Sequence, residues 1–273
     1  MKLLVIFTCF NRKDKTEKCI RTLDDGNPSC EFTFVIADDN SSDGTQELLT
    51  SMQKEYDIHL LKGDGNLFYS GGMRMGMDYA LKQFRTGYDY MIMMNDDVEF
   101  YDHCIEKMVE QSKEQHDSIV VGVMQDVDGQ MSYSGVRYIK GIHYEKVPIG
   151  EWKQEVDTFN ANCVMMPYAA FAKTGSIDHV YVHSLGDLDY GLALMKNGFK
   201  LHVSREYVGC CNNNDPTGSW TDTKLSRRER IKKKESVKGA PTKQWFYFLR
   251  KNFGILTAIR YTISPYVRII LGK

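Results

Sequence analysis

Short, unbroken apolar runs recur along the first two thirds of the chain, and each one ends in polar residues. They occupy residues 2–9, 32–37, 58–61, 90–98, 118–124 and 159–167. Runs of this length are typical of buried strands in a sheet that is covered on both faces. Segments with helical spacing at 16–23, 46–56 and 73–84 separate the first four runs. This rhythm predicts an α/β fold in which right-handed βαβ units build a mostly parallel central sheet flanked by helices.

Acidic residues stand at the ends of two of these runs. Asp38 and Asp39 follow the second run, and Asn95, Asp96 and Asp97 close the fourth. Ligands of open α/β sheets bind beyond the carboxyl ends of the strands, so these side chains are candidates for a binding site. Adjacent carboxylates supply the oxygen ligands that Mg²⁺ and Mn²⁺ prefer, with substrate phosphates completing the coordination. Asn-Asp-Asp is also ordinary turn chemistry, so a surface turn remains the alternative.

A glycine-rich segment at 63–76 leads into the third predicted helix. Its glycines, which include Gly71 and Gly72, let the backbone approach a ligand closely, and a helix start presents free N–H groups to an anion. The segment contains no GK[ST] and is not a GxGxxG that follows the first strand, so ATPase and dinucleotide-binding functions lose support. An ordinary flexible connection is the alternative interpretation.

Later in the chain, polar residues interleaved with Tyr, Val and Gly at 125–150 predict a hairpin excursion. Gly186 and Asp187 then precede a short predicted helix at 189–196, which an Asn-Gly pair ends. An aspartate at a helix start is commonly an N-cap or a partner of the helix dipole. We assign that structural role to Asp189 and regard Asp187 as a candidate functional residue.

The character of the chain changes after Arg227. Basic residues crowd the next segment, and aromatic and aliphatic residues with regularly placed Arg and Lys follow. Trp245, Leu249, Phe253 and Leu256 share the spacing of one helical face. A basic helix with aromatic anchors and no acids predicts contact with an anionic membrane surface. Packing against the preceding domain or a second subunit is the alternative.

Composition narrows the class of protein. With 42% hydrophobic and 26% charged residues the 273-residue chain is globular, and a formal net charge of −1 argues against a nucleic-acid partner. The seven cysteines include no CxxC pair, so neither a disulfide framework nor a zinc site is indicated. The first apolar run ends too early for a signal peptide, and no run approaches the roughly 20 residues that span a bilayer. We therefore expect a cytoplasmic location.

Five segments together carry a family resemblance. They are VIFTCFNR at 5–12, VIADDNSSDGT at 35–45, GNLFYSGGMRMG at 65–76, MNDDV at 94–98 and LGDLDYGLALMKNG at 185–198. In order and spacing they resemble the family 2 glycosyltransferases of the GT-A fold, most of all the bacterial enzymes that build rhamnose- or galactose-containing surface polysaccharides such as lipopolysaccharide. The resemblance implies a GT-A catalytic domain at 1–215, with a nucleotide-binding half at 1–98 and an acceptor half at 99–215. A basic, aromatic helical extension would occupy 216–273.

The resemblance also implies roles around the nucleoside of a sugar-nucleotide donor. Thr8 and Phe10, at the end of the first strand, would line the nucleoside pocket. Asp39 would accept a hydrogen bond from the N3–H of uracil or thymine, which a purine does not supply in that geometry. Asp96 would touch the ribose or the sugar. These roles imply a UDP- or dTDP-sugar donor.

The diphosphate of that donor would lie along the glycine-rich segment. The resemblance places it beside Asn66, Gly71 and Gly72, with Arg74 as a charge partner. Arg74 stands where many family members have Asn.

Two carboxylates would carry the chemistry. Asp97, the second carboxylate of a DxD-like motif, would bind Mn²⁺ or Mg²⁺, and Asp187 would be the general base. Gly186 stands where the family usually has a Glu before this Asp, so a contact from that Glu to the acceptor is missing here.

Glycosyl transfer calls for these groups on physical grounds as well. Breaking a sugar–diphosphate bond develops negative charge on the leaving oxygen. A divalent ion stabilises this charge in the transition state, by roughly a few kcal/mol. A positioned carboxylate removes the proton of the attacking hydroxyl and contributes about 10²- to 10⁴-fold in rate. A single base opposite the leaving group gives direct displacement, hence inversion at the anomeric carbon.

We therefore expect an inverting, metal-dependent glycosyltransferase that moves a hexose or deoxyhexose from a UDP- or dTDP-sugar to a glycan or lipid-linked glycan, at the inner face of the cytoplasmic membrane. A sugar nucleotidyltransferase is one alternative, but it needs a glycine- and arginine-rich loop after the first strand, and FTCFNRKD at 7–14 is not one. A non-catalytic nucleotide-sugar-binding scaffold is the other.

Overall fold

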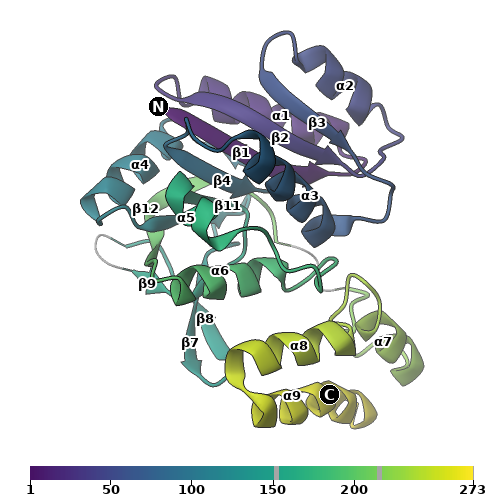
Figure 1. Ribbon diagram of the computed structural model, residues 1–273. Helices are drawn as coiled ribbons and strands as arrows, with labels where there is room; N and C mark the ends of the chain where they lie inside the picture. The colour runs from purple at the N-terminus through teal and green to yellow at the C-terminus, as the bar shows by residue number, and fades with distance from the viewer. Residues whose placement is uncertain (151–153, 214–216, 273) are drawn as a thin grey trace.

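Each apolar run predicted as a strand contributes to the central sheet, although the run predicted at 159–167 is divided, with Phe159 in a second sheet and only 163–167 in this one. The computed structural model of the protein describes residues 1–150, 154–213 and 217–272 (Figure 1). In spatial order the strands are β3 (Asp57–Lys62), β2 (Glu31–Asp38), β1 (Lys2–Cys9), β4 (Tyr90–Met94), β11 (Cys163–Pro167), β6 (Ile119–Gln125), β12 (Leu201–Cys210) and β5 (Glu99–Phe100), with β9 (Glu155–Val156) paired to β12. The first four strands are parallel, and β11 runs antiparallel to β4 and β6.

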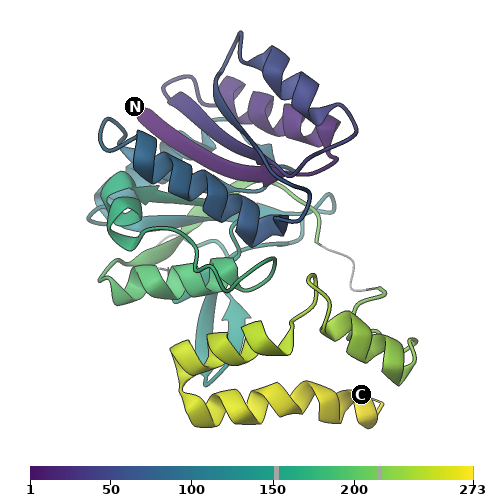
Figure 2. The same ribbon diagram turned by 45° about the vertical axis from the view of Figure 1, so that its right-hand side comes forward.

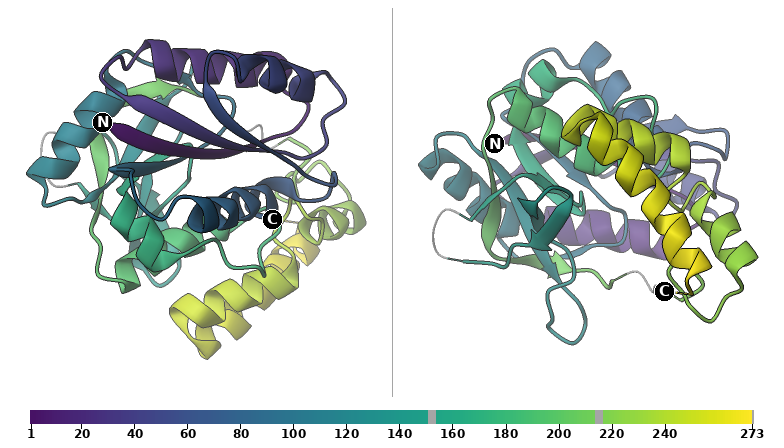
Figure 3. Two further views of the ribbon diagram at one scale, coloured as in Figure 1. Left: turned by 45° about the horizontal axis from the view of Figure 1, so that its top comes forward. Right: turned by 90° about the horizontal axis from the view of Figure 1, so that it is seen from below.

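Alternation along the strands divides the core into two layers. On β1, Leu3, Val5 and Phe7 belong to one layer and Leu4 and Ile6 to the other, as the two-residue period of a strand requires. The first layer contains α1 (Lys13–Asp25), α2 (Thr45–Met52) and α4 (Cys104–Glu114), and the second contains α3 (Phe68–Gln83), α5 (Tyr168–Thr174) and α6 (Gly186–Lys196). Figure 3, left, shows α1 and α2 above the sheet and α3 below it. β1 and β4 are almost entirely apolar because both of their faces are buried.

A small second sheet projects from the main one. It joins β10 (Thr158–Phe159), β7 (Gly135–Lys140) and β8 (His143–Lys146) in antiparallel pairs. β7 and β8 form the hairpin predicted within 125–150, and they reach toward the C-terminal helices (Figure 1). The predicted α/β fold with a mostly parallel central sheet is therefore confirmed.

The predicted division of the domain at residue 98 falls inside one continuous sheet. β4 ends just before this position, and β11, β6 and β12 from the second half extend the same sheet. We therefore keep the division into a nucleotide half and an acceptor half as a proposal about function alone. The predicted boundary at 215 lies outside the described residues.

Within the described residues 217–272, the C-terminal extension folds into three helices, α7 (Arg227–Lys234), α8 (Thr242–Phe253) and α9 (Ile255–Ile270). α8 and α9 pack side by side as a hairpin that turns at Gly254, whose φ of 86° favours glycine (Figure 2). The single apolar face predicted from Trp245 to Leu256 is therefore wrong. Leu249 is buried in α8, whereas Leu256 belongs to α9 and is 80% exposed.

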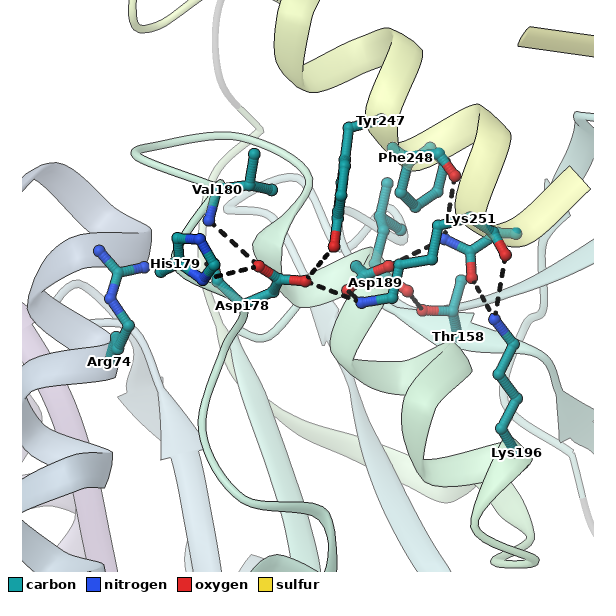
Figure 4. Close-up of polar contacts among 12 residues, drawn as sticks. Arg74, Thr158, Asp178, His179, Val180, Asp189, Lys196, Tyr247, Phe248 and Lys251 are labelled. Carbon is teal, nitrogen blue, oxygen red and sulfur yellow. Dashed lines mark hydrogen bonds and ion pairs between the residues drawn. The ribbon is translucent and has the colours of Figure 1, made fainter. Parts of the chain in front are cut away.

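α8 is attached to α6 by a network of charged and polar side chains (Figure 4). Asp189, in the first turn of α6, is 3% exposed and accepts hydrogen bonds from Lys251 Nζ at 2.6 Å and Asn252 Nδ2 at 2.8 Å. Asp178 accepts from Tyr247 Oη at 2.7 Å and from Lys251 Nζ at 3.1 Å. The predicted N-cap is not formed, because the Asp189 carboxylate binds α8, but Asp189 lies in the first turn of α6, as the alternative role of a partner of the helix dipole requires.

We expect Asp189→Asn to lower the free energy of unfolding by about 1.5–3 kcal/mol, the range for a hydrogen bond to a charged group. The amide removes the charge that pairs with Lys251 and turns an N–H₂ group toward either Lys251 or Asn252. Urea denaturation measures the change, and Asp128→Asn, on an exposed turn, is the matched control. Equal stability of the two variants would argue against this docking contact.

None of the helices within the described ranges is both long and apolar enough to cross a bilayer. All seven cysteines lie in those ranges, and all are free thiols.

Candidate active site

β1 and β4 are neighbours in the sheet, so residues that follow them meet at one edge. Asp96 and Asp97 follow β4, and Arg12 follows β1. Arg12 Nη1 lies 2.9 Å from Asp96 Oδ1 and 2.9 Å from Asp97 Oδ2. One guanidinium thus offsets the repulsion between two adjacent carboxylates. Arg12 was not predicted as a site residue, and the only signal in the sequence was a cation close behind the first strand.

The two carboxylates differ in burial. The Asp96 side chain is 6% exposed and the Asp97 side chain 21%. Burial raises the pKa of Asp96 to about 6, against the opposing effect of Arg12. Asp97 Oδ1 lies 3.7 Å from Cys211 Sγ. A ligand that enters from solvent therefore reaches Asp97 more easily than Asp96.

The ligand chemistry of this pair fits a divalent ion. Mg²⁺ and Mn²⁺ take oxygen ligands and are commonly held by one or two carboxylates together with water and substrate phosphates. In the part of the chain that the structure describes, no group of three or more His, Cys, Asp or Glu side chains is placed to hold an ion by itself. A bound substrate would have to complete the coordination, and Arg12 would have to release or share Asp97 Oδ2. Burial raises the pKa of Cys211 to about 12, so its neutral thiol is a poor competitor for the ion.

Asp39 is bound by the loop that leads into α3. Its Oδ1 accepts from Gly65 N at 2.8 Å and Leu67 N at 3.2 Å, and its Oδ2 accepts from Phe68 N at 3.0 Å. An ionised carboxylate has about four acceptor sites, so three backbone N–H groups leave little capacity for a base. The predicted hydrogen bond from Asp39 to uracil or thymine stays a prediction, and the structure adds a loop-positioning role.

The start of α3 differs from the prediction. The helix begins at Phe68, about a turn before the predicted start, so Gly71 and Gly72 are helical and buried. Ser70 N and Gly71 N both donate to Val182 O, at 3.0 and 3.2 Å. The prediction that this helix start presents free N–H groups to an anion is therefore wrong for these donors.

Gly72 has a packing explanation that involves Thr8. A Cβ at Gly72 would lie 2.2 Å from Thr8 Oγ1, so only glycine lets α3 approach β1 this closely. Thr8 Oγ1 in turn donates to Ala37 O at 2.9 Å, which ties β1 to β2 just before the sheet edge. The predicted contacts of Thr8, Gly71 and Gly72 with a donor stay predictions.

The remaining predicted donor residues divide by exposure. Phe10, directly after β1, is 51% exposed, and Asn66 is exposed in the loop before α3. An open aromatic ring at this edge is suited to pack against a nucleobase. Arg74 is already engaged, because its Nη1 donates to Tyr181 O at 3.0 Å and to Asp178 O at 3.3 Å. The Arg74 side chain is therefore bound to the segment before α6, and its predicted contact with a diphosphate stays a prediction.

Asp187 lies in the first turn of α6. Its Oδ1 accepts from Leu188 N at 2.8 Å, and its Oδ2 has a longer contact with Ala161 N at 3.4 Å. Burial raises the pKa of Asp187, although these hydrogen bonds act in the opposite direction. The Tyr69 hydroxyl is buried without a partner among the described residues, and burial, followed by the Asp187 charge, raises the pKa of Tyr69. Asp187 also has a side-chain hydrogen bond with Asn160, so it has the features of a base that its neighbours hold in place.

The glycine before Asp187 is required by packing. A Cβ at Gly186 would lie 2.4 Å from Ser70 Oγ and 3.0 Å from Ile177 Cγ2. Ser70 Oγ itself donates to His183 O at 2.7 Å. The first turn of α6 thus sits directly on the first turn of α3, and a larger residue at 186 would separate them.

A short path of contacts connects Asp97 with Asp187. Cys211 Sγ lies 3.7 Å from Asp97 Oδ1 and 3.4 Å from Asn162 Nδ2. The residue before Asn162 is Ala161, whose N–H faces Asp187 Oδ2. The two carboxylates therefore flank one short backbone segment, although they are far apart in the sequence.

The model of the family described as glycosyl transferase family 2 matches residues 4–175, well over half of the chain. The chain belongs to glycosyl transferase family 2. The predicted family is thereby confirmed, and so is the prediction that the protein is a glycosyltransferase.

Two curated relatives are bacterial proteins. This glycosyltransferase is 25% identical over 133 residues to GalNAc(5)-diNAcBac-PP-undecaprenol beta-1,3-glucosyltransferase of Campylobacter jejuni, with 48% of this chain and 41% of the relative covered. It is 23% identical over 209 residues to the succinoglycan biosynthesis protein ExoA of Rhizobium meliloti, with 74% and 60% covered. The chain thus matches between about two fifths and three fifths of the length of these relatives.

Solved structures share the fold. TarS 1–349 of S. aureus in complex with UDP-GlcNAc matches with a TM-score of 0.58 and 13% identity, covering 99% of this chain and 82% of that one. The mannosyltransferase PcManGT of Pyrobaculum calidifontis, in complex with GDP-Man and Mn²⁺, matches with a TM-score of 0.58 and 12% identity, covering 99% and 73%. At these identities the similarity establishes the GT-A arrangement and no more.

Proposed function

We propose that this glycosyltransferase moves a hexose or deoxyhexose from a UDP- or dTDP-sugar to a hydroxyl of a glycan or lipid-linked glycan, with inversion at the anomeric carbon. The observation that carries the proposal is the contact path from Asp97 through Cys211 and Asn162 to Asp187. On this proposal, a carboxylate suited to a metal ion and a carboxylate suited to proton transfer would lie on two sides of one site.

Asp97, assisted by Asp96, would hold the divalent ion. When bound, Mn²⁺ or Mg²⁺ would act as a Lewis acid that stabilises the charge on the departing diphosphate, a contribution of about several kcal/mol. Arg12, whose Nη1 lies 2.9 Å from Asp96 Oδ1 and from Asp97 Oδ2, would keep Asp96 in place when Asp97 binds the ion. Phe10 offers its exposed ring to the nucleoside.

Asp187 would remove the proton of the acceptor hydroxyl. The backbone N–H of Leu188 fixes Oδ1 at 2.8 Å, whereas the contact of Oδ2 with Ala161 N is longer, at 3.4 Å, so Oδ2 would be the oxygen that takes the proton, with Asn160 as a further partner of the carboxylate. Because burial raises its pKa, Asp187 is a stronger base than a carboxylate in water. A single base on the acceptor side implies one direct displacement and an inverted product.

The relatives support the choice of substrates. The Campylobacter jejuni relative is named for a PP-undecaprenol acceptor, which supports a lipid-linked acceptor and a peripheral position at the membrane. TarS was solved with UDP-GlcNAc and PcManGT with GDP-Man and Mn²⁺, which supports a nucleotide-sugar donor and a metal ion. Since the two donors carry different bases, our choice of UDP or dTDP rests on the predicted role of Asp39.

A thermal-shift panel of UDP, dTDP, GDP and ADP, each with and without Mn²⁺, tests the donor. A ligand that binds only the folded state at about 100-fold excess over its Kd stabilises the protein by roughly 2.7 kcal/mol. We expect UDP or dTDP to raise the melting temperature only when Mn²⁺ is present.

The pattern of responses decides between the options. Stabilisation by GDP alone would overturn the base assignment, and stabilisation without Mn²⁺ would overturn the metal assignment. No response to any nucleotide would favour a non-catalytic scaffold. Retention of anomeric configuration in a transfer product would contradict the single-displacement mechanism.

A further inference from the structure

The outermost helix of the C-terminal extension presents a row of large apolar side chains to solvent. In Figures 1 and 2, α9 lies at the edge of the molecule farthest from the central sheet, with α8 between it and α6. Seven apolar residues of α9 and its C-terminal end are between 46% and 80% exposed: Ile255, Leu256, Ile259, Ile263, Val267, Ile270 and Leu271. A soluble domain rarely exposes so many large apolar side chains together without a function.

These residues form one continuous stripe. Ile255, Ile259, Ile263, Val267 and Leu271 follow one another at every fourth position, and side chains four apart are neighbours on a helix surface. The opposite side of α9 contributes Ala258 and Ile269, which are fully buried. α9 is therefore amphipathic. Ala258 and Ile269 pack against the protein, and the apolar stripe on the other side is left exposed to solvent.

The contact that covers α8 does not cover this stripe. α8 turns Phe248 and Leu249 into the core, and Lys251 and Asn252 hold it to Asp189. The alternative that the extension packs on the preceding domain is thus correct for α8. The packing of α8 on the domain leaves the apolar stripe on the outer face of α9 exposed to solvent.

The charged side chains of α9 itself are all positive, and the exposed acids near it, Glu229 and Glu235, belong to α7 and its C-cap. Arg260 lies four residues after Leu256 and three before Ile263, and Arg268 lies three before Leu271, so both are next to the stripe. Residues 241–272 contain no Asp or Glu. α7, which packs against α9, adds four exposed basic residues: Arg227, Arg228, Lys232 and Lys233.

Not every basic residue of the extension is available to a partner. Lys234 is fully buried and donates to Ala240 O at 3.1 Å, Thr242 Oγ1 at 2.8 Å and Tyr266 Oη at 3.2 Å. Arg230 is buried as well. These two side chains join α7 to the rest of the extension. The exposed cations of α7 named above are therefore the ones that a partner can reach.

We propose that the stripe on α9 lies in the interfacial layer of an anionic phospholipid membrane, with Arg260 and Arg268 at the level of the phosphates. Apolar side chains on one helix face with cations beside them match this layer in both its acyl and its charged part. A second copy of the chain fits less well. Two such faces would bring arginines together with no acid on either hairpin to pair with them.

This contact deepens the proposed function and rests on it for its purpose. Lys251 and Asn252 attach the hairpin to Asp189, two residues after Asp187 on the first turn of α6. A membrane bound by α9 would therefore have a fixed relation to the candidate base. A lipid-linked acceptor in that membrane would be presented to Asp187 without a free search through solution.

Co-sedimentation of the full chain with vesicles tests the surface. We expect binding to vesicles of equal phosphatidylglycerol and phosphatidylcholine, and at least about tenfold weaker partitioning to pure phosphatidylcholine. Ile259→Asp/Ile263→Asp is expected to weaken partitioning to the mixed vesicles by about tenfold or more. Arg260→Gln/Arg268→Gln is expected to weaken it severalfold and to reduce its dependence on salt.

Val127→Asp is the matched control, because Val127 is 74% exposed on a turn remote in sequence from α9, and its partitioning should equal that of the unmodified chain. Equal partitioning of the Ile259→Asp/Ile263→Asp variant would overturn the proposal, as would absence of binding by the unmodified chain. A dimer in the absence of vesicles that this variant dissociates would also overturn it, in favour of a subunit interface.

The nucleotide thermal shift, measured on the same proteins, separates this inference from the proposed function. Both variants should keep the response of the unmodified chain, because their substitutions lie on exposed positions of α9. Vesicle binding without any nucleotide response would leave the membrane surface standing and remove the proposed function. A nucleotide response without vesicle binding would leave the proposed function standing and overturn the membrane surface.

Discussion

Asp187→Asn is expected to lower turnover by about 10²- to 10⁴-fold while donor binding stays unchanged. The asparagine side chain has the same size, and its carbonyl oxygen still accepts from Leu188 N, so the first turn of α6 keeps its geometry. It cannot accept the proton of an acceptor hydroxyl. Steady-state kinetics with the donor selected by the thermal-shift panel measures turnover, and the thermal shift itself measures donor binding.

The pH dependence gives a second measure of the same residue. A base must be ionised, so activity falls as the pH drops through its pKa. Because burial raises the pKa of Asp187, the acid limb of kcat/KM should lie above about 3.9, the usual value for Asp. The residual activity of the Asp187→Asn variant should lack that limb.

Asp128→Asn makes the same chemical change on an exposed turn and should leave kcat and the pH profile as they are. Turnover of Asp187→Asn within a factor of about two of this control would remove Asp187 from the role of base. The next residue to test would then be Tyr69, because the charge of Asp187 acts on its buried hydroxyl and raises its pKa, after the larger effect of burial.

Asp97→Asn is expected to abolish the Mn²⁺-dependent part of nucleotide stabilisation and to lower kcat/KM by about 10²-fold or more. An ion that contributes several kcal/mol to the transition state corresponds to that factor, because each 1.4 kcal/mol is about tenfold in rate. An amide oxygen is a weaker ligand than a carboxylate, and the substitution also removes the charge that holds Arg12 Nη1.

Cys211→Ser is the neighbouring control for Asp97. Its thiol lies beside Asp97 Oδ1 but is neutral because burial raises its pKa, so the smaller hydroxyl should leave the response to Mn²⁺ in place. If the Asp97→Asn variant kept the full Mn²⁺-dependent stabilisation by UDP or dTDP, the ion would have to bind elsewhere or play no part.

The strands and the sheet edge with its carboxylates were predictable because their signals are local. A strand buried on both faces must be apolar along its length, and on β1 and β4 that requirement is visible in consecutive residues. The acids at the ends of β2 and β4 are then placed by the strands themselves. The hairpin of β7 and β8 followed from the same kind of local pattern.

Contacts between distant segments were not predictable from such patterns. Arg12 meets Asp96 and Asp97 only because β1 and β4 are adjacent in the sheet. From the sequence, Asp39 was expected to accept a hydrogen bond from a nucleobase. In the structure, backbone N–H groups of the loop before α3 and of the first residue of α3 donate to its carboxylate. Nothing within a few residues of either side chain announces these partners.

The C-terminal extension shows the same division. Its apolar and basic character was plain in the sequence, and so was its amphipathic spacing. Which apolar face is buried was decided by Gly254, where the chain reverses, and by Asp189, which binds Lys251 from another helix. The sequence by itself thus determined the family, the strands and the kinds of side chain at the sheet edge. Only the tertiary structure decided which of those side chains already have partners, because pairing depends on distances in space that local patterns do not contain.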